Sequence, residues 1–239
     1  MGRVQIKRQV LAILEQNRLD DIYNFFETNP EHLLLNALFS ALCNPIESVR
    51  WGSIVCFGRI IPLLADRRTE DARVVMRRFL WSLNDESGGI GWGAPESMAE
   101  IMCHSRRLRL EYLHMLLSYM CRDGEEIFQD GNYLELSMLQ RGLLWGVGRL
   151  SHYHRDEMVK QNNIVENVAA YLSSPDLNVV GLAIWTLGLL KAKSTEAMVT
   201  AFVGSSDLIL IYRDNLLREV TIGHLADEAI QAMSSRRLL

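Results

Sequence analysis

A short segment recurs along this chain with the same pattern of residues, and it constrains the fold more than any other feature of the sequence. Residues 49–60 and 139–150 both place a glycine six residues before a Gly-Arg pair, which a branched aliphatic residue follows. Residues 179–190 form a looser third copy that keeps the second glycine. Because a single helical repeat cannot bury its apolar face alone, this recurrence predicts a stack of similar helical units.

The spacing between the copies gives the length of one unit. Gly148 and Gly188 are 40 residues apart, and Gly58 and Gly148 are 90 apart, which fits two units of 45 with a divergent copy near residue 103. Helix-pair repeats of the HEAT and armadillo type have about 40–47 residues, whereas tetratricopeptide and ankyrin repeats have about 33–34. The chain therefore resembles HEAT-like repeat proteins. That resemblance implies an all-α fold, a right-handed α-α superhelix (HEAT-like solenoid) of about five helix-pair repeats.

Length and composition favour one continuous HEAT-like repeat domain over residues 1–239. No linker rich in Pro, Gly or Ser divides the chain, and its 49% hydrophobic and 23% charged residues are typical of a folded protein. Residues 1–8 lack the apolar core of a signal peptide, and no uncharged apolar run reaches the ~20 residues of a membrane span. We therefore expect a cytoplasmic protein with no membrane-spanning segment.

Apolar periodicity predicts helices along nearly the whole chain. The helix of the first repeat copy is expected to end near Pro62, because proline cannot donate the backbone hydrogen bond of a continuing helix. The run at 208–212 has the composition of a strand, but its helical neighbours favour a helix there. The later helices are expected at 69–83, 95–104, 106–121, 132–151, 157–172, 177–191, 195–203 and 207–233.

The repeat does not explain the segment that joins two helices at residues 84–95, which we call the Gly-rich loop. It holds four glycines and Trp92. Loops between stacked helices usually have about 2–8 residues, and longer ones are often functional. Glycine permits a positive φ and lets another group approach the backbone closely. The sequence therefore predicts a special conformation here and makes the loop a candidate binding element.

Two interpretations of the Gly-rich loop remain open from the sequence. Glycines before a helix can hold a phosphate, but neither the Gly-Lys-Ser/Thr of a Walker loop nor a preceding strand is present. Acidic side chains with a tryptophan suit a basic or polar segment of a protein partner instead. In the structural alternative, Trp81 and Trp92 pack between neighbouring repeats and the glycines only turn the chain.

The predicted binding residues come from one helix end, the Gly-rich loop, the following helix start and the second repeat copy. We expect an acidic groove with an aromatic floor, formed by Trp81, Asn84, Asp85, Glu86, Trp92, Glu96, Arg141 and Trp145. The predicted function is that of a noncatalytic binding or scaffold module, which recognises a protein partner through its concave face and the Gly-rich loop.

The sequence gives little support for a catalytic, metal or cofactor site. The sequence shows no local signature of a nucleophile with its base, which leaves enzymatic activity open but favours a noncatalytic role. The four cysteines are scattered, and His152 and His154 do not share one helix face, so we expect no metal site and no cofactor.

Two alternative functions rest on resemblance. The length and helix content resemble bacterial HEAT-like alkylpurine DNA glycosylases, yet DNA binding needs a basic surface and this chain has a net charge of −4. The arginines at 67–68, 77–78 and 106–109 could form a local patch, but the overall charge balance is against DNA binding. Resemblance to phycobilisome-lyase HEAT proteins would imply tetrapyrrole handling, on the fold alone. The Gly-rich loop and residues 139–146 also resemble a group of bacterial HEAT-like proteins, a resemblance that implies no particular activity.

Overall fold

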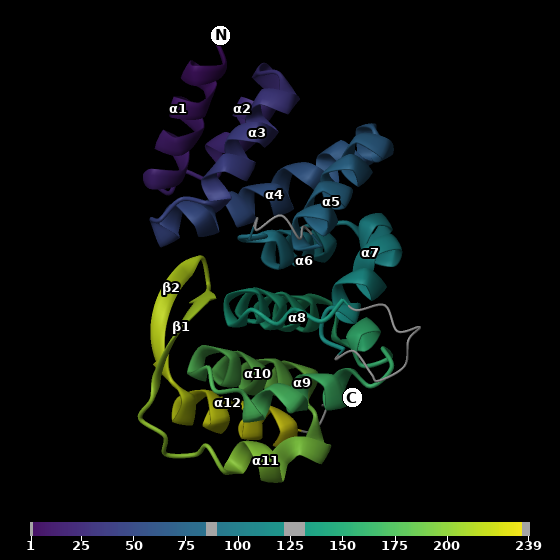
Figure 1. Cartoon of the computed structure of the whole chain (residues 1–239), viewed down its shortest axis with the longest axis vertical. Coiled ribbons are helices and arrows are strands. Elements are labelled where there is room, and N and C mark those ends of the chain that lie inside the picture. Colours follow the sequence, from purple (N-terminus) through teal and green to yellow (C-terminus); the bar gives the residue numbers. More distant parts are fainter. Residues whose placement is uncertain (1, 85–89, 122–131, 236–239) are drawn as a thin grey trace. The chain divides into compact units, whose positions relative to one another are not determined.

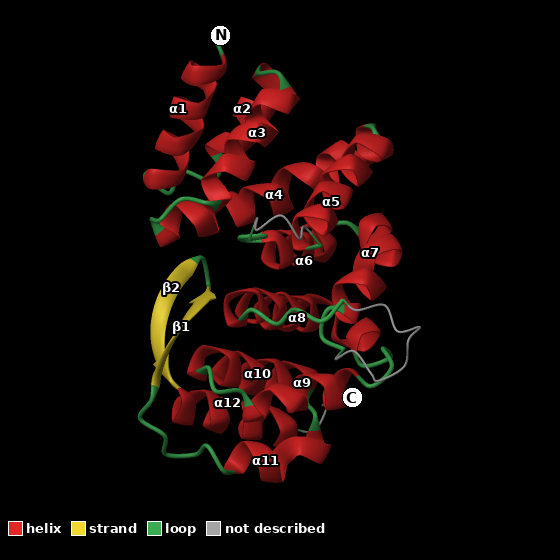
Figure 2. Cartoon of the chain, in the orientation of Figure 1, coloured by secondary structure: helices red, strands yellow, loops and turns green. Residues whose placement is uncertain are grey.

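The computed structural model describes residues 2–84, 90–121 and 132–235. Within these ranges the protein is built from helices, with one β-hairpin (Figures 1 and 2). The chain divides into two compact units, 1–113 and 114–239, and the division falls inside helix α7 (Arg106–Ser118). The predicted all-α class is confirmed for the described residues. Asp85 and Glu86 lie outside them.

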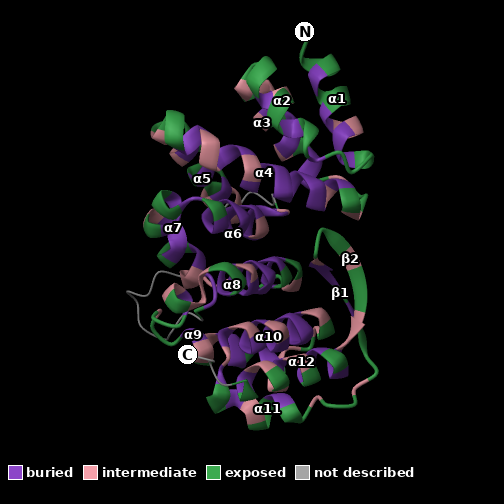
Figure 3. Ribbon diagram, turned by 180° about the vertical axis from the view of Figure 1, so that it is seen from behind, coloured by how far each residue is buried: buried purple, intermediate pink, exposed green. Residues whose placement is uncertain are grey.

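The N-terminal unit is assembled around one long apolar helix, α4. Its side chains are buried along much of its length (Figure 3). The rings of Phe57 in α4, Phe39 and Phe79 pack with centroids 4.8–5.0 Å apart and form the centre of this core. The helices of the unit, besides the first part of α7, are α1 (Arg3–Glu15), α2 (Asp21–Thr28), α3 (Glu31–Leu42), α4 (Glu47–Arg67), α5 (Thr69–Leu83) and α6 (Ala94–His104).

Helix α4 departs from the sequence prediction because it continues through Pro62 to Arg67. The helix loses the bond that Pro62 cannot donate, and Ile61, Leu64 and Ala65, all buried, hold the next turn in place by packing. Among the described helices, α4 alone is long and apolar enough to cross a membrane, but 72% of that stretch is buried within the protein. It has the burial expected of a core helix.

The C-terminal unit is centred on α10, which packs against α8 on one side and α12 on the other (Figure 1). Asp176 caps α10 by accepting hydrogen bonds from the amides of Asn178 and Val179. The elements are α8 (Ser137–Met158), α9 (Ile164–Ala169), the 3₁₀ turn η1 (Ala170–Ser173), α10 (Leu177–Leu190), the 3₁₀ turn η2 (Lys193–Thr195), α11 (Glu196–Thr200), β1 (Leu208–Arg213), β2 (Leu216–Thr221) and α12 (Ile222–Ser234).

The recurring glycines lie where helices cross closely, as their repetition predicts. A Cβ on Gly148 of α8 would stand 2.7 Å from Trp185 Cε3 of α10, and one on Gly188 of α10 would stand 2.8 Å from the Cα of Ala229 in α12. Gly58 of α4 faces Glu100 of α6 in the same way. The divergent copy expected near residue 103 is α6. Each glycine therefore permits the close crossing of one repeat helix with the next.

The hairpin at 208–221 contradicts the helix expected over 207–233, of which only the end, α12, is formed. β1 and β2 pair antiparallel and are joined by Asp214 and Asn215, both with φ near +55° (+53° and +60°). Asx residues tolerate this left-handed conformation, which two-residue hairpin turns require. Ile209 fills the space over Gly181, where a Cβ would lie 2.5 Å from Ile209 Cδ1. Tertiary packing thus overrides the helical neighbourhood.

Candidate functional site

The end of the Gly-rich loop is shaped by two glycines that contact neighbouring helices. Gly93 has a φ of +68°, and a Cβ there would lie 2.8 Å from Leu42 Cδ2 of α3. A Cβ on Gly91 would stand 3.0 Å from the carbonyl oxygen of Ser82 in α5. The predicted positive φ and close backbone approach are confirmed at these positions. The loop end is therefore set against both α3 and α5.

At the start of α6, which follows this loop end, Glu96 has a buried carboxyl oxygen on which the charge of Arg50 acts. The Arg50 guanidinium lies 5.9 Å from the Trp92 ring centroid and pairs with Glu47 at 2.6 Å. No described residue hydrogen-bonds Glu96 Oε2. Burial raises the pKa of Glu96 to about 7, although a bond from its own amide and the attraction of Arg50 oppose the shift. This carboxyl faces the protein interior.

A groove runs between α3 and α5, and the described end of the Gly-rich loop, from residue 90 onward, lines part of it. It consists of two hollows of about 610 and 630 Å³ that share His32, Asn36, Phe39 and Arg78. The first hollow also contacts Ile90, Gly91 and Trp92 of the loop end. The second has a floor of apolar residues from α3, α4 and α5, namely Leu35, Leu64, Val74 and Val75.

Arg78 marks the place where the two hollows meet. Its guanidinium stacks on the Phe39 ring at 3.7 Å, and its Nη1 donates to Asn36 Oδ1 at 3.0 Å. Partial burial lowers the pKa of Arg78. The two carboxylates that line the second hollow, Glu31 and Asp71, both pair with Arg68. Across the described residues Arg78 has no carboxylate partner.

The other predicted residues of the N-terminal unit have different surroundings. Trp81 is 74% exposed on α5, so the interpretation in which it packs between repeats is wrong for this side chain. Asn84 caps the C-terminus of α5, and its amide donates to the carbonyls of Leu80 and Trp81. The acidic charge expected for the groove comes from Asp85, Glu86 and Glu96, of which the first two lie outside the described residues and Glu96 has a buried carboxyl oxygen. A basic or polar partner at the loop stays a prediction.

Arg141 and Trp145 belong to α8 in the C-terminal unit, where both take part in packing. Trp145 is only 2% exposed, and its Nε1 donates to the Tyr212 carbonyl at 2.7 Å, which holds β1 against α8. Arg141 binds both carboxylate oxygens of Asp176, with its Nη2 2.6 Å from Oδ2. Trp145 is thus too buried for a ligand to reach as it stands.

We expect Asp176→Ala to lower the free energy of unfolding by about 1–2 kcal/mol, the usual range for losing a helix cap. Burial raises the pKa of Asp176, but bonds from Arg141 and from the Val179 and Asn178 amides outweigh it and leave the pKa below its ordinary value. The matched variant Asp176→Asn keeps a capping oxygen and should lose less. Urea unfolding at pH 7 measures both, and equal losses would refute the capping role.

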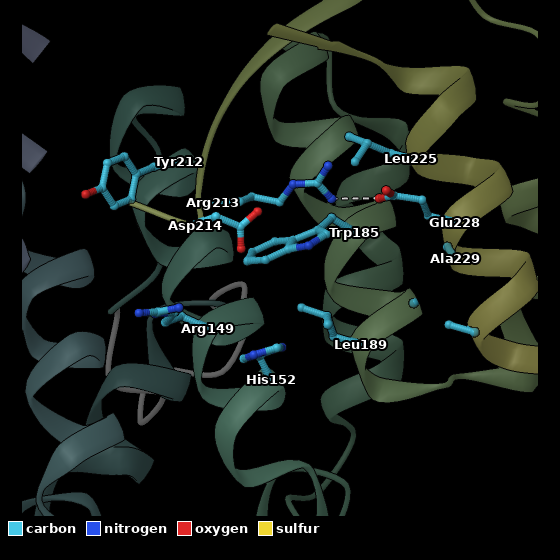
Figure 4. A pocket seen from close by; sticks show the side chains of 12 residues that line it. Arg149, His152, Trp185, Leu189, Tyr212, Arg213, Asp214, Leu225, Glu228 and Ala229 are labelled. Carbon is cyan, nitrogen blue, oxygen red and sulfur yellow. Dashed lines mark hydrogen bonds and ion pairs between the residues drawn. The ribbon is translucent and has the colours of Figure 1, made fainter. Parts of the chain in front are cut away.

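A second pocket, of about 370 Å³, lies in the C-terminal unit between α8, α10, α12 and the hairpin. Figure 4 shows Trp185 in its middle, with Arg149 and His152 on one side and the Arg213–Glu228 ion pair on another. Glu228 accepts from Arg213 at 2.7 Å and lies 3.2 Å from His224. The Arg149 guanidinium stacks on Tyr153 at 4.7 Å. The charges here are largely engaged with one another.

The groove residues were not predicted, although the sequence carries a trace of them. After its first residue, Glu31, the polar residues of α3 recur at i, i+4 and i+8: His32, Asn36 and Ser40. Their spacing defines one helix face, and all three are exposed and line the first hollow. Of the facing positions on α5, the sequence singles out only Arg78, as part of a basic patch.

Comparison with known proteins addresses the architecture. No family model matches this chain, and no curated protein does. The designed armadillo repeat protein YIII(Dq)4CqI is similar over 96% of this chain and 91% of its own, with a TM-score of 0.52 and 12% identity. The chain has an armadillo-type helical-repeat fold. An engineered protein is similar over 98% and 97% of the two chains, with a TM-score of 0.52 and 13% identity. At such identities the armadillo-type likeness concerns the fold alone.

Proposed function

We propose that this protein is a noncatalytic repeat scaffold that binds an extended segment of a partner protein in the groove between α3 and α5. The observation that carries the proposal is the pair of adjoining hollows, lined in part by residues 90–92 and floored by apolar side chains. Val74 is 53% exposed on this floor, although most apolar side chains of α5 are covered. A partner segment would cover it.

The dimensions of the groove suit a short extended peptide. The 12 residues of α3 rise about 1.5 Å each and span roughly 18 Å. An extended chain advances about 3.3 Å per residue, so roughly five or six residues would lie along the helix. The groove offers them apolar floor contacts and, at its edges, the polar side chains of His32 and Asn36. This combination is typical of sites that bind a segment by shape and a few polar contacts.

The arginines favour a protein partner over nucleic acid. Three of the arginines that were candidates for a basic patch are paired with carboxylates: Arg67 with Glu27, Arg68 with Glu31, and Arg77 with Glu70. Arg109 is buried and donates to the Met102 carbonyl. Charges paired in this way offer little attraction to a phosphate backbone. From the sequence, the acidic residues Asp85 and Glu86 favour a basic or polar stretch in the same partner. We also propose a cytoplasmic location.

The test is a selection of peptides from a random display library on the purified protein, followed by affinity measurements on two variants. Val74→Gln removes apolar contact from the groove floor, and we expect it to weaken selected peptides about tenfold. Leu110→Gln is the matched control, because Leu110 is 64% exposed on α7 and does not line the groove. Equal affinities for both variants, or no selected peptides, would contradict the proposal.

A further inference from the structure

Arg78 is a cation of the groove whose charge no described carboxylate balances, as is Arg3 at the first hollow, and the surroundings of Arg78 indicate what it binds. Arg78 and its neighbour Arg77 are both exposed on α5, yet they differ in their partners. Arg77 pairs with Glu70 at 2.6 Å. Within the described ranges, Arg78 instead donates to the amide oxygen of Asn36 and stacks on the face of Phe39.

Both contacts hold the Arg78 guanidinium in one orientation. Stacking on Phe39 fixes the plane of the group, and the bond from Nη1 to Asn36 Oδ1 fixes its rotation within that plane. These contacts occupy one face and one N–H group of a guanidinium that carries five donors. A planar fork that is held in advance loses little conformational entropy when it binds a carboxylate.

We propose that Arg78 binds the side-chain carboxylate of an aspartate or glutamate in the partner segment. This inference rests on the proposed function and specifies the chemistry of the segment. Because Arg78 lies where the two hollows meet, the bound chain continues on both sides of it. An internal acidic side chain satisfies this geometry, whereas a C-terminal carboxylate at Arg78 would leave one hollow empty. The segment is thus apolar with a central acid.

The experiment uses a selected peptide that contains an aspartate or glutamate and has an amidated C-terminus. A second peptide is identical except that asparagine or glutamine replaces the acidic residue. Their dissociation constants are measured with the parent protein, with Arg78→Gln and with the matched control Arg77→Gln. We expect the acidic peptide to bind the parent protein and the Arg77→Gln variant at least about tenfold more tightly than the amide peptide does. The Arg78→Gln variant should bind the two peptides with similar affinity. Melting temperatures confirm that each variant is folded.

The outcomes separate this inference from the proposed function. In one outcome, Val74→Gln lowers the affinity for the peptides while Arg78→Gln keeps the full preference for the acidic peptide over the amide peptide. In that case the groove binds segments, but Arg78 does not bind a carboxylate. Selected peptides without acids would overturn the inference in the same way. If Val74→Gln has no effect, the groove itself is refuted. A further control is competition by a single-stranded oligonucleotide. If it displaces the acidic peptide and binds Arg78→Gln more weakly than the parent, the site binds phosphate instead.

Discussion

Replacing Glu96 by glutamine should stabilise the protein by about 3 kcal/mol at pH 8, and by almost nothing at pH 4. Burial raises the pKa of this carboxyl from 4.5 to about 7 in the folded protein. Between those values the folded state holds a proton that the unfolded state has released. The favourable contribution is therefore present below about pH 4.5 and is lost as the pH rises through 7. Each pKa unit corresponds to about 1.36 kcal/mol, which sets the expected size.

The measurement is urea unfolding of the parent and Glu96→Gln between pH 4 and pH 8. Glu111→Gln is the control of opposite sign, because hydrogen bonds from Arg73 lower the pKa of Glu111 despite the opposing effect of burial. That variant should destabilise the protein at pH 8, and its effect should fade as the pH falls. A pH-independent difference between the parent and Glu96→Gln would show that the Glu96 carboxyl is not desolvated in the folded protein.

Gly148→Leu should lower the free energy of unfolding by about 3 kcal/mol. A leucine has a better helix propensity than glycine by about 0.5–1 kcal/mol, so a loose crossing would make the change stabilising. Here the added Cβ would stand 2.7 Å from Trp185 Cε3 and 2.8 Å from Thr186 Oγ1. Thr186 is also tied to α8 by a 3.1 Å bond to the Leu144 carbonyl, which limits its movement. Overpacking of this kind typically costs about 1–3 kcal/mol.

The matched comparison is Gly52→Ala, a glycine of the first repeat copy with a less crowded surface. A Cβ there would meet the flexible ends of Leu14 and Leu19 at 3.2 and 3.3 Å, so a shift of a few tenths of an ångström relieves the contact. We expect thermal melting to show little change for Gly52→Ala and a clear loss for Gly148→Ala and Gly148→Leu. Higher melting temperatures for the Gly148 variants would show that the α8–α10 crossing is not close.

The repeat architecture could be predicted from the sequence because its signal is local and recurs. The glycines that permit α4, α8 and α10 to cross their neighbours stand at a regular spacing, and this spacing together with apolar periodicity predicted α6. The hairpin was not predicted because the interactions that stabilise it are tertiary contacts. Ile209 needs the space over Gly181, and β1 needs the bond from Trp145 to Tyr212. The Asp214–Asn215 turn was the local signal that could have revealed it.

Only part of the candidate site could be predicted from the sequence, because only part of its signal is local. The Gly-rich loop could be recognised from its glycines and Trp92, because these residues are close together in the sequence. The unpaired charge of the groove depends on which arginines pair with an acid, and for Arg67 and Arg68 that acid is distant in sequence: Glu27 lies 40 residues before Arg67, and Glu31 lies 37 before Arg68. One repeat length separates each pair. No local pattern distinguishes the unpaired Arg78 from its paired neighbour Arg77.

The most direct test of the account is the position at which a bound peptide touches the protein. A photoreactive phenylalanine derivative is placed at His32, an exposed residue of α3 that lines both hollows, and in a second protein at His114, an exposed residue outside the groove. After irradiation with a selected peptide, the adduct is quantified by mass spectrometry. The account predicts efficient crosslinking at position 32, suppressed by excess unlabelled peptide, and little at 114. Crosslinking at 114 with none at 32 would contradict it.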